Sequence, residues 1–215
     1  MKEFFSLFQR IKFKLGMDRK NFILNYAKSQ KVTRILEIGV FNGNFAERLL
    51  TILAKNSPNS KIYYLGVDLF ADRFTESIYV SEVSLHPESL SNVQKKLSKF
   101  NNVTVELIEG DSAYVLPRLK NKQFDLIHID GGHSYDTVSK DWNNVSKLMK
   151  FDTAVFFDDY TNLRGIAKGN FGVNNVVDHI DAKIFDIKLS LNRDFFWKEY
   201  GLLILRMVKV TFKTK

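Results

Sequence analysis

Residues 124–137 read FDLIHIDGGHSYDT, an apolar run that stops at an acid, two glycines and a histidine. A short apolar run of this kind predicts a buried strand, and the helical spacing after it predicts a helix. Loops at strand ends carry chemistry more often than packing. The stretch therefore predicts a strand–loop–helix unit whose loop holds Asp130 and His133.

The same order repeats along the chain. Strand-like apolar runs occupy residues 34–39, 61–68, 102–110, 124–130 and 153–159. Between them, apolar residues recur at helical spacing, as at Phe45, Leu49 and Leu53. Strands that alternate with helices predict right-handed βαβ units and a parallel sheet covered on both faces, which explains why the strands are apolar throughout.

The last part of the chain differs. Residues 182–190 and 201–210 are strand-like runs joined by a loop too short for a crossover helix, so they are expected to pair as an antiparallel hairpin. The predicted fold class is α/β. We expect a Rossmann-like, three-layer αβα sandwich with a mostly parallel seven-stranded sheet and an antiparallel C-terminal hairpin.

Residues 1–30 precede the sheet and are predicted to be a helical extension, with the main domain at 31–215. Phe4, Phe8, Ile11 and Leu15 lie on one face of the first predicted helix. The extension could be a lid or a membrane-surface helix. Packing against the domain, or against a second subunit in a homodimer, is the favoured interpretation.

Composition sets the outer limits. The chain has 215 residues, 45% of them hydrophobic, and no cysteine, so it can bury a full core but forms no disulfide or thiolate metal site. No stretch resembles a signal peptide or approaches the roughly 20 apolar residues of a membrane span, and we expect a cytoplasmic protein.

The net charge of +8 could attract nucleic acid, anionic lipid or a phosphorylated substrate. Solvated lysines are the favoured explanation, and a nucleic-acid partner is not expected because no aromatic–basic RNA-binding motif is present.

Acids and glycines stand where the predicted strands end. They are Glu37, Gly39 and Gly43 after the first strand, Asp68 after the second, Asp111 and Ser112 after the third, Asp130 and His133 after the fourth, and Asp158 and Asp159 after the fifth. Parallel strands bring these ends to the sheet edge where ligands bind. Two alternatives stay open. The glycines, whose spacing is not that of a dinucleotide loop, could begin the helix for structural reasons alone, and Asp111 or Ser112 could cap a helix.

Four stretches carry a resemblance to a known family: LEIGVFNGNFAERL, VELIEGDSAYVLPRL, FDLIHIDGGHSYD and AVFFDDY. Together, over about residues 30–210, the chain resembles the class I S-adenosylmethionine-dependent methyltransferases. More narrowly it resembles metal-dependent O-methyltransferases of the catechol and macrocin types. The resemblance implies S-adenosylmethionine as cofactor, with Glu37, Gly39 and Gly43 beside its methionine part, Asp68 on its ribose, and Asp111 and Ser112 near adenine.

The resemblance also implies a metal site. Asp130, Asp158 and Asp159 match the carboxylate ligands of a divalent cation, and such oxygen ligands suit Mg²⁺. Asp159 departs from the catechol type, where asparagine is common. His133 stands where those enzymes carry a lysine base, so Asp130 and His133 are the predicted catalytic residues. His128 is expected to be a core or cofactor-adjacent residue.

Two further segments, 70–86 and 160–175, are expected to determine the substrate, and Arg164 and Lys168 could bind a phosphate or carboxylate there. The leading hypothesis is a metal-assisted O-methyltransferase acting on a sugar or a small glycosylated metabolite. An RNA or protein methyltransferase and a non-catalytic cofactor-binding subunit are the alternatives, because a fold alone does not establish activity.

Overall fold

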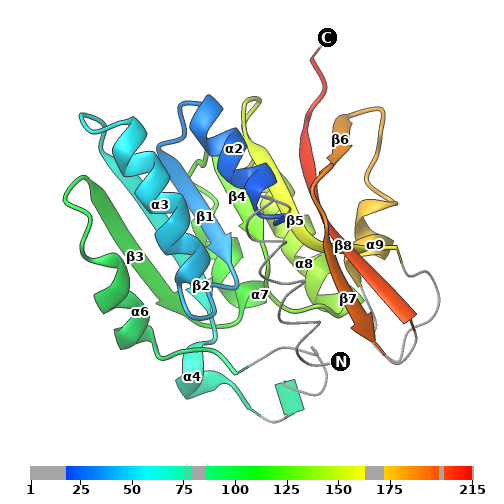
Figure 1. The fold of residues 1–215 in the computed structure, drawn as a ribbon, viewed down its shortest axis with the longest axis horizontal. Helices are drawn as coiled ribbons and strands as arrows, with labels where there is room; N and C mark the ends of the chain where they lie inside the picture. Colours follow the sequence, from blue (N-terminus) through cyan, green and yellow to red (C-terminus); the bar gives the residue numbers. More distant parts are fainter. Residues whose placement is uncertain (1–17, 76, 79–85, 163–171, 199–200, 215) are drawn as a thin grey trace.

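The structure is a computed structural model that describes residues 18–75, 77–78, 86–162, 172–198 and 201–214. Strands and helices alternate through most of these residues (Figure 1). In chain order the elements are α2 (Asn21–Ser29), β1 (Arg34–Ile38), α3 (Asn44–Asn56), β2 (Ile62–Asp68), α4 (Phe70–Arg73), α6 (Leu90–Leu97), β3 (Val103–Glu109), α7 (Ser112–Val115), the 3₁₀ helix η1 (Leu116–Leu119), β4 (Leu126–Ile129), α8 (Tyr135–Val145), the 3₁₀ helix η2 (Ser146–Leu148), β5 (Ala154–Thr161), α9 (Gly172–Val177), β6 (Phe185–Leu189), β7 (Asp194–Lys198) and β8 (Gly201–Phe212).

The strands form one sheet in the order β3-β2-β1-β4-β5-β8-β6. Strands β1 to β5 are parallel to their neighbours among themselves, as predicted. The chain adds β2 and β3 on one side of β1, and then β4 and β5 on the other. The strand order therefore reverses between β1 and β4, and such a switch point opens a crevice at the carboxyl ends of the strands.

Two apolar cores lie on opposite faces of the sheet, so the three-layer α/β class is confirmed. One core joins α2, α3 and α6 to alternate strand residues such as Ile35 and Phe156. The other joins α7, α8 and α9 to the intervening residues such as Leu36 and Phe157. Figure 1 shows α2 and α3 in front of the strands and α7 and α8 behind them. Burial on both faces explains the continuous apolar runs of the sequence.

The antiparallel end is confirmed, with one strand more than expected. Strand β8 pairs with both β5 and β6 in antiparallel fashion. Strand β7 pairs with the first part of β8, so the described strands form an eight-stranded sheet in place of the predicted seven. The reason lies in length, because β6 covers only the second half of β8, from Val208 to Phe212. The first half of β8, Gly201 to Leu205, pairs with the short strand β7, which lies where the sequence predicts a loop.

Helix α2 packs on the sheet. Its buried side chains Ile23, Leu24 and Ala27 belong to the same core as Ile35 of β1. Residues 1–17, which hold the predicted first helix, lie outside the described residues. The domain boundary at residue 30 and the homodimer stay predictions. None of the helices in the described part of the chain has the length and apolar character to cross a membrane; the expected cytoplasmic location also stays a prediction.

Asp125 holds the opposite end of the sheet together, at the start of β1 and β4. Its Oδ2 accepts hydrogen bonds from the backbone N–H groups of Thr33 and Arg34 at 2.8 and 2.9 Å, and Lys150 Nζ lies 2.7 Å from Oδ1. Burial acts to raise the pKa of Asp125, but the bonds from Lys150, Thr33 and Arg34 outweigh it and lower the pKa below its usual value.

We expect Asp125→Asn to lower the free energy of unfolding at pH 7 by about 2 kcal/mol, because charge-assisted hydrogen bonds are lost. A carboxyl with a depressed folded-state pKa stabilises above its unfolded pKa and loses that effect as the pH falls. The difference between wild type and Asp125→Asn should therefore shrink below about pH 4. Urea unfolding at pH 7, 5 and 3.5 measures it, and a difference that is constant over this range would contradict the assignment.

Candidate active site

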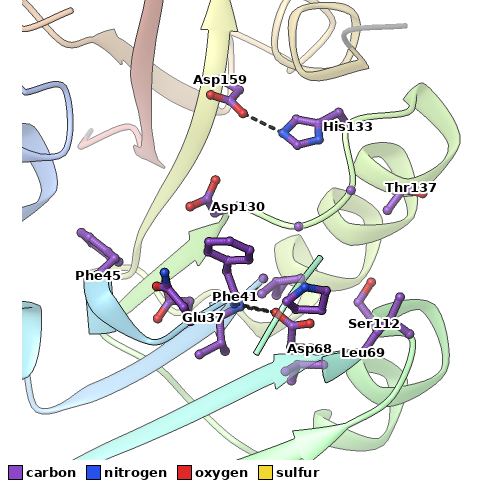
Figure 2. Close-up of a pocket in the computed structure, with 18 of the residues that line it drawn as sticks. Glu37, Phe41, Phe45, Asp68, Leu69, Ser112, Asp130, His133, Thr137 and Asp159 are labelled. Carbon is purple, nitrogen blue, oxygen red and sulfur yellow. Dashed lines mark hydrogen bonds and ion pairs between the residues drawn. The ribbon is translucent and has the colours of Figure 1, made fainter. Parts of the chain in front are cut away.

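A cavity of about 710 Å³ opens at the switch point, which is the lower edge of the sheet in Figure 1. This volume falls in the range of small-molecule and cofactor sites. Figure 2 shows acidic side chains from several strand ends around it. The structure brings most of the predicted site residues to this one cavity: Glu37, Gly39, Asp68, Asp111, Ser112, Asp130, His133 and Asp159.

The glycines after β1 have different roles. Gly39 has φ +86°, and a Cβ atom built there would lie 2.1 Å from the carbonyl oxygen of Asp130. Only glycine therefore lets the ends of β1 and β4 meet this closely. Gly43 does not line the cavity; it precedes α3 in the left-handed conformation, with φ +71°. The conformation of Gly43 sets the direction in which α3 begins, and so the direction of the first backbone N–H groups of that helix, which have no partner within it.

Asp68 ties the ends of β1 and β2 together. Its Oδ2 accepts hydrogen bonds from the backbone N–H groups of Val40 and Phe41, each at 2.7 Å, and its Oδ1 accepts one from Phe70 at 2.9 Å. Burial raises the pKa of Asp68, although these three hydrogen bonds oppose the rise. A carboxylate has about four acceptor positions, so Asp68 can still receive a hydroxyl donor from the cavity.

Asp111 and Ser112 follow β3 at the cavity wall. The Asp111 side chain accepts a hydrogen bond from the backbone N–H of Ala113 at 2.8 Å and is the N-cap of α7. The capping alternative raised by the sequence thus holds for Asp111. Ser112 is the first residue of α7 and lies half-buried beside the cavity.

Glu37 is buried at the cavity floor in a polar chain with two other buried side chains. The hydroxyl of Tyr64 donates to one of its carboxylate oxygens. The other oxygen lies 3.2 Å from Nδ1 of His128. Buried polar groups cost free energy unless they are hydrogen-bonded, so this chain fixes the imidazole of His128 in one orientation.

Asp130 and Asp158 face each other at the ends of β4 and β5, and two basic residues enter between the acids. Lys20 Nζ lies 2.7 Å from Asp130 Oδ2 and 3.3 Å from Asp158 Oδ2. The guanidinium of Arg19 pairs with Asp158, and also with Asp159 and Asp194 at 2.6 Å each. Both basic residues directly precede α2, so the docking of that helix brings them to the site.

Asp159 is turned away from the Asp130–Asp158 pair. Its backbone has φ +57°, a conformation uncommon for a residue other than glycine. Its Oδ2 lies 2.7 Å from Nε2 of His133, as Figure 2 shows, while its Oδ1 meets Arg19. A carboxylate that fixes an imidazole is the arrangement of a general base with its orienting partner. Strain at such a residue is typical of functional sites.

The charges of the cluster determine its protonation. Burial raises the pKa of Asp130 to about 6, although the ammonium of Lys20 opposes the rise. Burial also acts to raise the pKa of Asp158, but Arg19 and Lys20 outweigh it and hold that pKa well below the usual value. The pKa of Lys20 is itself raised, because Asp130 and Asp158 outweigh the cost of burying its charge. Asp158 and Lys20 are therefore both charged at neutral pH.

A divalent cation fits the donor atoms of the cluster. His128, Asp130 and Asp158 each offer one atom, and these atoms lie within 4.8 Å of one another. Among the described residues, the buried Nε2 of His128 and Oδ2 of Asp158 have no hydrogen-bond partner, although Lys20 Nζ lies 3.3 Å from the second atom. Asp130 and Asp158 are two of the predicted ligands, and Asp159, the third, is not in this group. The ammonium of Lys20 lies against the same two carboxylates, as a cation would.

The sequence did not indicate Arg19, Lys20 or Asp194 as site residues. Arg19 and Lys20 stand in an ordinary basic stretch far along the chain from the strand ends, and Asp194 begins the unpredicted strand β7. His128 was expected in the core or near the cofactor, and it is buried at the cluster. Much of the two predicted substrate segments, including Arg164 and Lys168, lies outside the described residues. At the end of the second segment, Gly172 N–H donates to the carbonyl of His133 at 2.8 Å.

Known proteins provide a comparison. A family model described as a methyltransferase domain matches residues 36–160, more than half of the chain. No curated protein matches the sequence. The fold is similar to that of the O-methyltransferase TomG from Streptomyces achromogenes in complex with SAM (S-adenosylmethionine), with 16% identity over 89% of this chain and 79% of that chain and a TM-score of 0.57.

Two other solved structures have a similar fold. One is an O-methyltransferase from Bacillus cereus in complex with SAH (S-adenosylhomocysteine), with 16% identity over 89% of this chain and 80% of that chain and a TM-score of 0.60. The other is precorrin-6y C5,15-methyltransferase from Geobacter metallireducens, with 14% identity over 88% of this chain and 85% of that chain and a TM-score of 0.54. The family match confirms the resemblance found in the sequence, and the structures confirm the fold.

Arg19→Met tests the role of the buried guanidinium. Without it, the carboxylates of Asp158, Asp159 and Asp194 repel one another with less positive charge nearby. We therefore expect the free energy of unfolding, measured in the presence of a chelator, to fall by about 3 kcal/mol. Arg48→Met is the control, because Arg48 pairs with Asp18 at 2.9 Å on the surface and its side chain is 44% exposed. Its loss should stay within about 1 kcal/mol. If urea unfolding gave equal losses of free energy for the two variants, the buried ion pairs of Arg19 would stabilise the fold no more than a surface ion pair does.

Proposed function

The chain belongs to the methyltransferase-domain family and is a class I S-adenosylmethionine-dependent methyltransferase, and on that premise we propose that it methylates an oxygen of a small hydroxylated molecule. The observation that supports this most is the His133–Asp159 pair, 2.7 Å apart, at the same cavity as the predicted cofactor residues. A hydroxyl group needs a base to become a good nucleophile, and a histidine held by a carboxylate supplies one at neutral pH.

The cofactor side of the cavity has the chemistry that the donor requires. S-adenosylmethionine supplies an electrophilic methyl group when it is bound, and the protein orients the reactants. We assign the methionine part to Glu37, Gly39 and the α3 N-terminus that follows Gly43. Asp68 would accept a ribose hydroxyl, and this role is supported by its remaining acceptor positions and its place at the cavity wall. Asp111 and Ser112 would lie near adenine.

The acceptor side is formed by residues from β4 and β5. His133 would take the proton of the acceptor hydroxyl, and Asp159 would hold its imidazole and stabilise the charge that it gains. Asp130 and Asp158 would hold a divalent cation, with Asp159 at the edge of the same cluster. When bound, such a cation lowers the pKa of a coordinated hydroxyl. Mg²⁺ is the ion that the sequence resemblance implies.

The charge of the site favours a small acceptor over a nucleic acid. The cluster holds the four carboxylates of Asp130, Asp158, Asp159 and Asp194, and among the contacts described here its basic partners are Arg19 and Lys20. Before a cation binds, this excess of negative charge repels a phosphate backbone. A bound divalent cation would offset the excess, and the cavity of about 710 Å³ still suits a small molecule. We therefore propose a sugar or another small polyhydroxylated molecule, and we rank an RNA or protein acceptor and a non-catalytic role below it.

The base assignment is tested by His133→Asn. We expect the rate of S-adenosylhomocysteine formation, over a panel of sugars and phenols, to fall by at least about 100-fold because the base is lost. The affinity for S-adenosylmethionine, measured by calorimetry, should stay within a few-fold. His179→Asn is the matched control, since His179 is exposed and its Nδ1 lies 2.6 Å from the carbonyl oxygen of Asn175, four residues earlier. Equal rates in the two variants would remove His133 from catalysis.

A further inference from the structure

We propose that His128 is a nitrogen ligand of the divalent cation, with Asp130 and Asp158 as oxygen ligands and Glu37 as the carboxylate that orients the imidazole. The assignment rests on the proposed metal-assisted methyl transfer and specifies which atoms hold the ion. It differs from the ligand set implied by the sequence, Asp130, Asp158 and Asp159, in exchanging an oxygen for a nitrogen.

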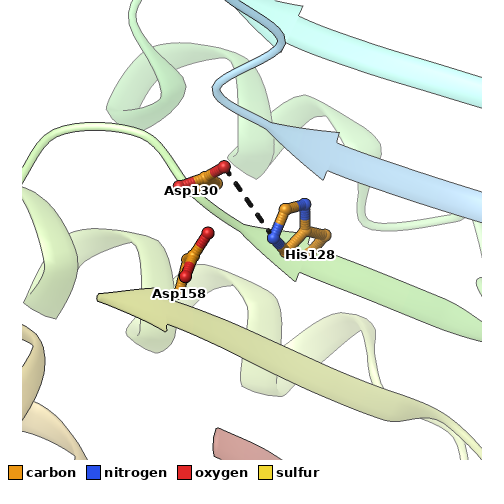
Figure 3. A group of neighbouring side chains, drawn as sticks. All are labelled: His128, Asp130 and Asp158. Carbon is orange, nitrogen blue, oxygen red and sulfur yellow. Dashed lines mark ion pairs between the residues drawn. The ribbon is translucent and has the colours of Figure 1, made fainter. Parts of the chain in front are cut away.

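The hydrogen bonding of His128 leaves one ring nitrogen available to a metal ion. The residue is fully buried, and its Nδ1 lies 3.2 Å from Glu37. Because a carboxylate only accepts, Nδ1 is the donor, and a neutral imidazole then carries its lone pair on Nε2. Within the described part of the chain Nε2 has no hydrogen-bond partner. It lies 4.0 Å from Asp130 Oδ2, toward which it points in Figure 3. Histidine ligands of metals are commonly held by a carboxylate in this way.

The donor atoms of His128, Asp130 and Asp158 are close enough together to bind one ion. Three atoms that lie within 4.8 Å of one another share a point no more than 4.8/√3, or about 2.8 Å, from each. Bonds from Zn²⁺, as an example of a divalent first-row metal, to nitrogen and oxygen are roughly 2.0–2.2 Å, so side-chain movements of at most about 0.8 Å close the site. Asp158 contributes Oδ2, whose contact among the described residues is the ion pair with Lys20 at 3.3 Å and which accepts no hydrogen bond from them. Asp159 is less available, since its two oxygens already meet Arg19 and His133.

The cluster already holds a cationic group between its carboxylates. The ammonium of Lys20 lies against Asp130 and Asp158, and 4.9 Å from the ring centre of Phe45, which packs on His128. This position is therefore selective for positive charge. A metal ion would take the place of the ammonium, so Lys20 and the ion compete for the same carboxylates.

The ligand set determines the class of metal. Mg²⁺ prefers oxygen ligands and retains several waters, whereas imidazole nitrogen suits the first-row transition metals. A site with one nitrogen and two carboxylate oxygens should therefore bind Mn²⁺ or a similar ion more tightly than Mg²⁺. The sequence resemblance implied three oxygen ligands and Mg²⁺.

The test uses the full chain with Mn²⁺ and no other ligand. Bound Mn²⁺ is counted by electron paramagnetic resonance, and pulsed measurements detect the coupling of the ion to a coordinated ¹⁴N nucleus. We expect an imidazole coupling in the wild type that changes on ¹⁵N-histidine labelling, which needs no substitution in the core. His128→Asn should lose the coupling and weaken Mn²⁺ binding at least about tenfold, whereas His133→Asn, the control at the neighbouring histidine, should keep it. Lys20→Met should bind Mn²⁺ several-fold more tightly than the wild type.

Other results overturn the assignment. Bound Mn²⁺ without a nitrogen coupling, or with a coupling that survives in folded His128→Asn, excludes His128 as a ligand. Failure of both the wild type and Lys20→Met to bind Mn²⁺ at millimolar concentration rejects the site altogether. Methyl transfer is measured separately, as S-adenosylhomocysteine formation with a chelator present. Turnover under those conditions would keep the O-methyltransferase proposal and show that the reaction needs no metal ion, whatever the Mn²⁺ spectra show for the ligands.

Discussion

Ionised carboxylates buried at the ends of β4 and β5 need positive partners, and this constraint organises the site. Asp158 is almost completely buried and stays charged because Arg19 and Lys20 lie against it. Uncompensated charges in a protein interior cost several kcal/mol each, so the acids and the basic pair are retained together. The basic pair precedes α2, and α2 packs in the same core as β1. When α2 packs on the sheet, it therefore also brings Arg19 and Lys20 to the carboxylates and neutralises them.

The sheet topology provides the other half of the site. Reversal of the strand order between β1 and β4 opens the cavity, and Gly39 lets the two strand ends approach closely. Asp68 then fixes the loop after β1 through backbone N–H groups of Val40 and Phe41. The same carboxylate that is proposed to bind ribose thus also shapes the loop. Substitutions of Asp68 will combine a binding effect with a loop effect, which makes His133 the cleaner probe of the chemistry.

Local patterns explain what the sequence predicted and what it did not. The five parallel strands follow from apolar runs, and the convergence of Asp130 and Asp158 follows from the rule that parallel strands end at one edge. Strand β7 was not predicted because its pairing depends on the length of β8. Arg19 and Lys20 were not predicted because their partners lie more than a hundred residues away, and nothing in a basic stretch distinguishes a buried ion pair from a solvated one. The turn of Asp159 toward His133 depends on a positive φ, which the sequence of an acidic pair does not reveal.

The central claim is that a methyl donor and the carboxylate cluster share the cavity at the switch point. The most direct measurement is a crystal structure of the protein with S-adenosylhomocysteine. Our account predicts the nucleoside between the ends of β1, β2 and β3, near Asp68 and Ser112, with the sulfur directed toward His133 and Asp130. A cofactor bound elsewhere, or one whose sulfur is turned away from these two side chains, would contradict it.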